Sequence, residues 1–174
     1  MRADRQRFNP GDHLLLRGCA TFHGSLRLDS SDAGTPTEPV TISSYGRDRA
    51  RIVSGTQSAV LVENAGGVSV SKLVVVGSGP HPNHGSGVEM VNRLNGGKRL
   101  GFIRVSGIDA SGFGYAGIAV NGEAWRPQPE RLRGRPDHEL LGHDNQYFGV
   151  IAAGYFAPNA SAFANKNVYI GPST

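Results

Sequence analysis

The chain contains a single cysteine, three lysines and few aromatic residues among its 174 residues. Cys19 alone forms no disulfide within the chain and has no histidine beside it, so we expect a small buried or half-buried side chain and not a nucleophile. No apolar run reaches the ~18 to 20 residues of a membrane span, and the start, MRADRQRFNPGD, shows no export signal. The length suits one domain, residues 1–174, with no membrane span.

The basic charge comes almost entirely from arginine. The net charge is +4, and lysine occurs only at 72, 98 and 166. Arginine-rich surfaces suit carboxylate or phosphate partners, although a codon-biased genome gives the same excess. The arginines are spread over loops and are not interleaved with aromatic residues, so we expect no nucleic-acid binding.

Glycine is abundant, with 25 residues, and short alternating strands recur through the sequence. The segment VSVSKLVVVGSG from Val68 has a near-copy, IRVSGIDASG, from Ile103, and an earlier strand, VTISSY, starts at Val40. The steps between these three segments are 28 and 35 residues, and the weak segment HELLGHDN at His138 follows 35 after Ile103. VYIG from Val168 resumes this series.

A second series of strands keeps the same period. Its steps are 34, 28, 30 and 32 residues, and its members are SLRL from Ser25, AVLV from Ala59, GVEM from Gly87, GIAV from Gly117 and GVIA from Gly149. A strand that returns to the same place after ~30 residues pairs parallel with its predecessor. The sequence therefore predicts an all-β fold, a single-stranded right-handed parallel β-helix of about four to five coils.

The alternation also predicts which side chains form the core. The residues expected to point inward, each against its counterpart one coil away, are Val40, Ile42, Val60, Val62, Val68, Val70, Leu73, Val88, Met90, Ile103, Val105, Ile108, Ile118 and Val120. By the same alternation Glu89 should point outward. We expect Met1 to Asn9 to be a loose entry segment and residues 30–39 to be a loop.

The opening coils resemble a known superfamily. PGDHLLLRG, TFHGSLRL, EPVTISSYG, RARIVSG and AVLVENAGGVSVSKLVVVGSG are similar to the first coils of right-handed β-helix proteins of the pectate-lyase-like superfamily, over roughly Pro10 to Gly122. This resemblance implies a polysaccharide or glycan partner and an extracellular or cell-surface location, because members are mostly secreted polysaccharide lyases, glycoside hydrolases and epimerases, with phage tailspikes beside them. It does not imply a reaction, and the diagnostic lyase and pectin-hydrolase signatures are absent.

Two classes of function follow from this resemblance. The first is a carbohydrate-active enzyme, a polysaccharide lyase or glycoside hydrolase, and the second is a noncatalytic surface, adhesion or scaffold module. Relatives carry N-terminal extensions and caps, so we expect this chain to be a piece of a longer exported protein. With no capping helix in the sequence, unpaired strand edges at the ends predict self-association.

Asp109 and Asp144 are the strongest candidates for a functional site. They lie 35 residues apart, the step between the copies at Val68 and Ile103, which predicts that they stack in neighbouring coils. Stacked carboxylates persist by sharing a proton, meeting an arginine or binding Ca²⁺. We expect His143 to handle protons and Arg104 to neutralise charge there, under the basic segment from Glu123 to Arg135. The alternative is that both aspartates are separately solvated turn residues.

Three further patterns have mainly structural interpretations. The sequence GFGYAG at 112–117 matches a dinucleotide-binding pattern, but a strand follows it instead of a helix, which favours a turn. His81 and His84 in HPNH fit a solvated loop, with sugar contact or a metal as alternatives. Asn64, Asn92 and Asn121 end successive strands of the second series, which predicts a structural asparagine ladder.

Overall fold

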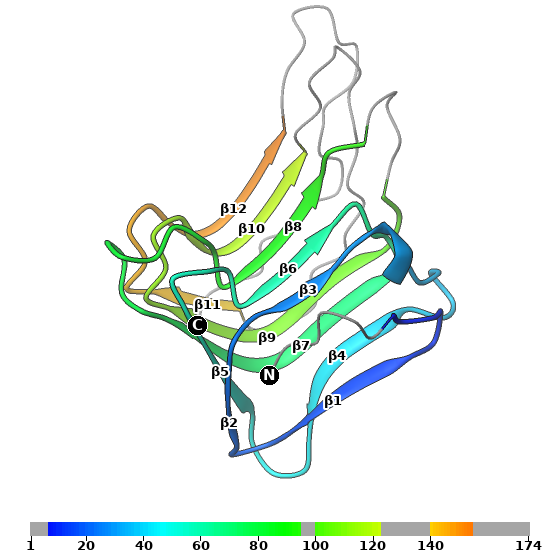
Figure 1. Ribbon diagram of the computed structural model, residues 1–174, viewed down its shortest axis with the longest axis horizontal. Coiled ribbons are helices and arrows are strands. Elements are labelled where there is room, and N and C mark those ends of the chain that lie inside the picture. The colour runs from blue at the N-terminus through cyan, green and yellow to red at the C-terminus, as the bar shows by residue number, and fades with distance from the viewer. Residues whose placement is uncertain (1–6, 95–99, 123–139, 155–174) are drawn as a thin grey trace, which may run out of the picture.

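Parallel β-strands are the main structural element of the described part of the protein. Its structure is a computed structural model that describes residues 7–94, 100–122 and 140–154 (Figure 1). The described strands form two sheets. The first sheet contains β1 (His13–Arg17), β2 (Thr21–His23), β4 (Val40–Tyr45), β5 (Ala50–Gly55), β7 (Val68–Gly77), β9 (Ile103–Ser111) and β11 (Leu140–His143). The second contains β3 (Leu26–Leu28), β6 (Val60–Glu63), β8 (Val88–Asn92), β10 (Ala116–Gly122) and β12 (Phe148–Gly154).

Each strand pairs with the strand one turn of chain further on, and every pairing is parallel. In the first sheet, β4 pairs with β7 and β7 with β9, so Val40, Val68 and Ile103 share one register position. In the second sheet, β3, β6, β8, β10 and β12 follow one another in order, as the stacked arrows of Figure 1 show. The predicted steps of 28 and 35, and of 34, 28, 30 and 32, are confirmed. This repeating parallel arrangement is compatible with a β-helix.

The two longest strands of the first sheet, β7 and β9, each bend at a residue with a left-handed backbone conformation. β4 pairs with the first half of β7, and β5 pairs with its second half. Between the two halves Lys72 has φ 53°, and Gly107 has φ 59° at the corresponding place in β9. Glycine adopts this left-handed conformation without steric cost. At Lys72, which has a side chain, the conformation is accompanied by a hydrogen bond from Oγ of Ser44 to the Lys72 carbonyl oxygen at 2.5 Å. The bend turns the two halves of each strand towards different directions (Figure 1).

The core lies between the two sheets and consists of aliphatic side chains in register. Of the fourteen residues predicted to point inward, thirteen are buried, and Val120 is partly buried against them. Val70, for example, has no exposed surface and lies between Ile42 and Val105 in the neighbouring coils. Stacked aliphatic side chains of this kind remove apolar surface from water in every coil. This burial is the main source of stability in a repeat fold.

The N-terminal end of the core is better ordered than the sequence predicts. Phe8 is buried, and its backbone N–H donates to Oδ1 of Asp32 at 2.9 Å. Asp32 belongs to a 3-10 helix, Ser30–Asp32, whose N-cap is Asp29. The expectation of a loose segment is therefore wrong for Phe8, and the stretch expected as a plain loop begins with this short helix. A helix long and apolar enough to cross a membrane is absent from the described residues.

The asparagine ladder is only partly as predicted. Asn64 has the expected left-handed conformation, with φ 60°, and its Oδ1 accepts from the Arg93 N–H at 2.6 Å. Asn92 is fully buried one coil further on. Asn121, however, pairs with Val91 and is therefore one residue out of line with Asn92. The sequence suggested that the three asparagines end their strands at equivalent positions, but Asn121 lies one register position before Asn92.

Candidate functional site

Asp109 and Asp144 do not stack directly, which corrects the sequence-based prediction. β9 and β11 pair Ile108 with Leu140 and Asp109 with Leu141, a step of 32 residues instead of 35. Asp144 follows the end of β11 and has a left-handed backbone with φ 53°. The last described turn of chain is thus three residues shorter than its predecessor, a change that the weak repeat at His138 did not reveal.

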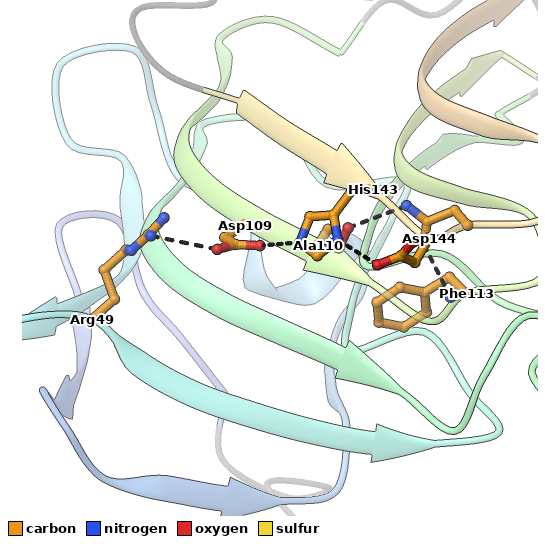
Figure 2. Close-up of polar contacts among 7 residues, drawn as sticks. Arg49, Asp109, Ala110, Phe113, His143 and Asp144 are labelled. Carbon is orange, nitrogen blue, oxygen red and sulfur yellow. Dashed lines mark hydrogen bonds and ion pairs between the residues drawn. The ribbon is translucent and has the colours of Figure 1, made fainter. Parts of the chain in front are cut away.

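His143 connects the two aspartates instead. Its Nε2 lies 3.1 Å from Oδ1 of Asp109, and its Nδ1 lies 2.8 Å from Oδ2 of Asp144. The second oxygen of Asp109, Oδ2, lies 3.5 Å from a guanidinium nitrogen of Arg49. Figure 2 shows these four side chains in a row from Arg49 to Asp144. We call this row the Asp–His row.

The local strand geometry explains why the row faces outward. Asp109 lies between the buried residues Ile108 and Ala110 on β9, so its side chain points away from the core. The exposed fractions of the side chains are 24% for Asp109, 55% for His143 and 84% for Asp144. The row therefore runs from a half-buried carboxylate to one that is open to solvent.

The contacts of His143 determine its charge. A neutral imidazole has one N–H and one acceptor nitrogen, whereas both nitrogens of His143 lie within hydrogen-bonding distance of carboxylate oxygens. Only the imidazolium form donates to both. The hydrogen bond to Asp144, and then the one to Asp109, raise the pKa of His143 above its ordinary value, against a smaller opposing effect of burial.

Arg49, and not Arg104, supplies the cation of the row. Arg104 lies opposite Ser69 on the first half of β9, on the other side of the Gly107 bend from Asp109. Arg49 reaches Asp109 from the start of β5, two strands away in the sheet. The repeat spacings in the sequence did not point to Arg49, because its long side chain crosses a coil to reach Asp109.

Asn145 holds the turn that carries His143 and Asp144. Its Nδ2 donates to the Ala110 carbonyl oxygen at 3.1 Å, and its Oδ1 accepts from the Phe113 N–H at 3.0 Å. Asn83, in the turn of chain before that of Phe113, likewise bonds to the backbone of the preceding coil, because its Nδ2 donates to the Gly55 carbonyl oxygen at 2.6 Å. Both asparagines stand four residues before a glycine of the second strand series, Gly87 or Gly149. This shared spacing was the signal that could have identified Asn145.

The geometry gives no support to a Ca²⁺ ion shared by Asp109 and Asp144. The carboxylates lie on opposite sides of the imidazole ring, and each is engaged by a ring nitrogen. Calcium requires several oxygen ligands around one point. No group of three or more histidine, cysteine or acidic side chains in the described ranges has the geometry of a metal site.

The remaining candidate residues are not members of the row. His81 and His84 are exposed, and the loop between them is held by the buried Asn83, which agrees with the structural interpretation of HPNH. Glu89 points outward as predicted and accepts from Oγ of Ser58 at 2.5 Å. Cys19 is exposed instead of buried, and a hydrogen bond from its thiol to Asp48 raises its pKa. The segment from Glu123 to Arg135 lies outside the described residues.

Comparison of the chain with models of known protein families, with curated protein sequences and with solved structures finds no match.

Proposed function

We propose that this chain is a single domain of right-handed parallel β-helix, of the pectate-lyase-like type, that binds polysaccharide at the Asp–His row. The handedness follows from the strong preference for right-handed crossovers between parallel strands. Support for the architecture comes from the register, because the same positions of consecutive turns lie next to each other in both sheets. The polysaccharide partner follows from the resemblance of the opening coils.

The observation that carries the binding proposal is the chemistry of the Asp–His row. Sugar hydroxyls are both donors and acceptors, and they bind well where charged acceptors and donors lie side by side. Asp144 is such an acceptor and is open to solvent, and the His143 imidazolium beside it, whose two N–H groups donate to Asp109 and Asp144, holds it in position. The stack of strands fixes their positions in advance, which reduces the entropy lost when a ligand binds.

Cleavage of the polysaccharide is a second candidate function, and one observation favours it. The imidazolium of His143 is a solvent-accessible proton donor beside two carboxylates. However, hydrolysis by paired carboxyls needs one protonated and one ionised group, and β-elimination needs a free base. Both carboxylates here accept from the same imidazolium, so the arrangement suits binding better than either reaction.

We further propose that the protein works outside the cell or at its surface. This follows from the polysaccharide partner, which is found there. An epitope-tagged copy of the full gene product, expressed in its source cells and followed by cell fractionation, tests the location. Recovery of the tag exclusively from the cytoplasm would count against it.

The experiment that tests binding uses affinity electrophoresis and calorimetry with a panel of uronic and neutral polysaccharides. Asp109→Asn and Asp144→Asn, made separately, should weaken binding by about tenfold, because a hydrogen bond to a charged group contributes ~1.5–3 kcal/mol. Asp48→Asn is the matched control, because Asp48 also has a left-handed backbone, with φ 62°, but lies outside the row. Unchanged binding in both row variants would exclude this site.

The same panel separates binding from cleavage. Unsaturated products absorb in the ultraviolet and indicate a lyase, whereas new reducing ends indicate a hydrolase. A bound polysaccharide that stays intact supports the noncatalytic surface module. The appearance of either product, lost in His143→Gln, would establish the enzyme instead.

A further inference from the structure

An exposed group of aromatic rings adjoins the Asp–His row. Among the described residues, Tyr147 and Phe148 are two large apolar side chains that are exposed, with exposed fractions of 65% and 43%. The ring of Phe148 meets that of Tyr115 edge to face, with centroids 5.9 Å apart, and lies 6.4 Å from the ring of Tyr147. These contacts hold the three rings together at the surface.

The backbone explains why the rings lie near the row. Tyr147 belongs to the short turn between β11 and β12 that also contains Asp144 and Asn145. The Phe148 N–H donates to the Tyr115 carbonyl oxygen at 3.1 Å, so the turns of consecutive coils are in contact here. One turn thus presents both a polar end, at His143 and Asp144, and an aromatic end.

The three rings have different surroundings. Phe148 shares its register position with Ala116, which is fully buried, so Phe148 lies on the core side of β12. Tyr115 is half-buried, and Tyr147 is the most exposed of the three. Tyr147 is therefore the ring available to a ligand, and the other two support it.

The charges in the row indicate what kind of sugar the turn accepts. Arg49 and the His143 imidazolium are balanced by Asp109 and Asp144, and each cation is already paired with a carboxylate. Binding a uronate needs a surplus cation at the site, and the row provides none. Neutral sugars need only hydrogen-bonding groups and an apolar surface, and both are present.

We propose that Tyr147, supported by Phe148 and Tyr115, is a stacking surface for a pyranose ring of a neutral polysaccharide. The C–H face of the sugar lies on the tyrosine ring, while its hydroxyls donate to the carboxylate of Asp144. Burying two apolar faces against each other gives affinity, and the adjacent polar groups orient the sugar. This inference rests on the proposed function and adds to it the class of sugar.

The test compares Tyr147→Ala, Tyr147→Phe and the control Tyr45→Ala. Tyr45 is also exposed, at 52%, but lies at the end of β4, in a different turn of chain from Asp144 and Tyr147. The probes are mixed-linkage β-glucan, xyloglucan and galactomannan as neutral polymers, and polygalacturonate and alginate as uronic ones. Calorimetry and affinity electrophoresis are run at low and high salt, with circular dichroism to confirm that each variant is folded.

We expect the unaltered chain to bind a neutral polymer with little dependence on salt. Tyr147→Ala should weaken binding by about tenfold, whereas Tyr147→Phe keeps the ring and should stay within about twofold. Tyr45→Ala should bind as the unaltered chain does. A preference for uronic polymers that disappears at high salt would overturn the inference.

Two further outcomes separate this inference from the proposed function. If Asp144→Asn weakens binding and Tyr147→Ala does not, the row binds sugar but the aromatic surface does not, and only the inference falls. If the unaltered chain binds none of the polymers, both proposals fall together.

Discussion

Nε2 of His143 lies 3.1 Å from Oδ1 of Asp109, although the backbone pairs Asp109 with Leu141. The side chain of His143 therefore ties the end of β11 to β9 diagonally, across the direction of the backbone pairing. The bond is charge-assisted, because the other ring nitrogen is engaged by Asp144 and the imidazole carries both protons. The stability of this corner thus depends on the protonation of one side chain.

The first prediction concerns pH. The pKa of His143 is raised in the folded chain above its ordinary value of 6.5. The stabilisation is therefore fully present below the unfolded pKa, and it is lost as the pH rises through the folded pKa. Urea unfolding should show His143→Gln less stable than the unaltered chain at about pH 5.5, by about 1 kcal/mol or less because the site is exposed.

At alkaline pH the two proteins should have the same free energy of unfolding. A titration of the His143 ring signals by NMR provides the direct check. Asp144→Asn and Asp109→Asn should each lower the His143 pKa, and Asp144→Asn should lower it more, because the Asp144 hydrogen bond is the largest cause of the shift. A His143 pKa at its ordinary value in the unaltered chain would contradict the double hydrogen bond.

The second prediction concerns Asn145 as a positioning residue. Asn145→Ala leaves the Ala110 carbonyl and the Phe113 N–H without this side-chain partner and should cost about 1–3 kcal/mol of unfolding free energy. It should also move the pKa of His143 towards its ordinary value, because the turn no longer holds His143 and Asp144 in place. Asn83→Ala is the matched control. It should lose stability comparably and leave the His143 pKa unchanged.

The third prediction tests the core. Val70 has no exposed surface, so Val70→Asp buries a carboxylate with no partner and should cost about 3 kcal/mol or more. Ser69→Asp, on the outward side of the same strand, should change the free energy of unfolding by less than about 0.5 kcal/mol. Thermal and urea unfolding measure both. Equal effects of the two substitutions would show that β7 is not placed as described.

The fourth prediction tests the contact between consecutive corner turns. A Cβ atom on Gly114 would lie 1.8 Å from the Asn83 carbonyl oxygen and 2.7 Å from that of Pro80. Gly114→Ala should therefore push the two turns apart and cost about 1–3 kcal/mol. Gly101→Ala is the control, because a Cβ there has no heavy atom within 4 Å. Comparable stability of the two variants would mean that the turns are not in contact.

The sequence was sufficient to predict the parallel repeat and its core. Val68 and Ile103 could be matched because inward positions alternate strictly and the same residue types recur one coil later. Glu89 was placed outward for the same reason. These features depend on periodicity, which a single sequence displays directly.

The candidate site was predicted less well, because it depends on differences between coils. Asp109 and His143 were identified, but their relation was not, since the three-residue shortening before β11 changes which residues lie opposite each other. Arg49 was missed because side-chain reach leaves no pattern in the sequence. Asn121 was expected in line with Asn92 but lies one residue out of register, because the ends of strands are set by turn geometry that the apolar pattern does not report.

The parallel pairing of consecutive coils also determines how the protein would respond to mechanical force. The hydrogen bonds between Val40, Val68 and Ile103 and their neighbours run along the stack, and each layer of bonds joins only two adjacent coils. A pull along this direction loads the layers in series, so they would open one at a time. Opening a layer such as that between Val40 and Val68 releases the 28 residues that separate them. Under tension, the stack would lengthen in discrete steps of one coil.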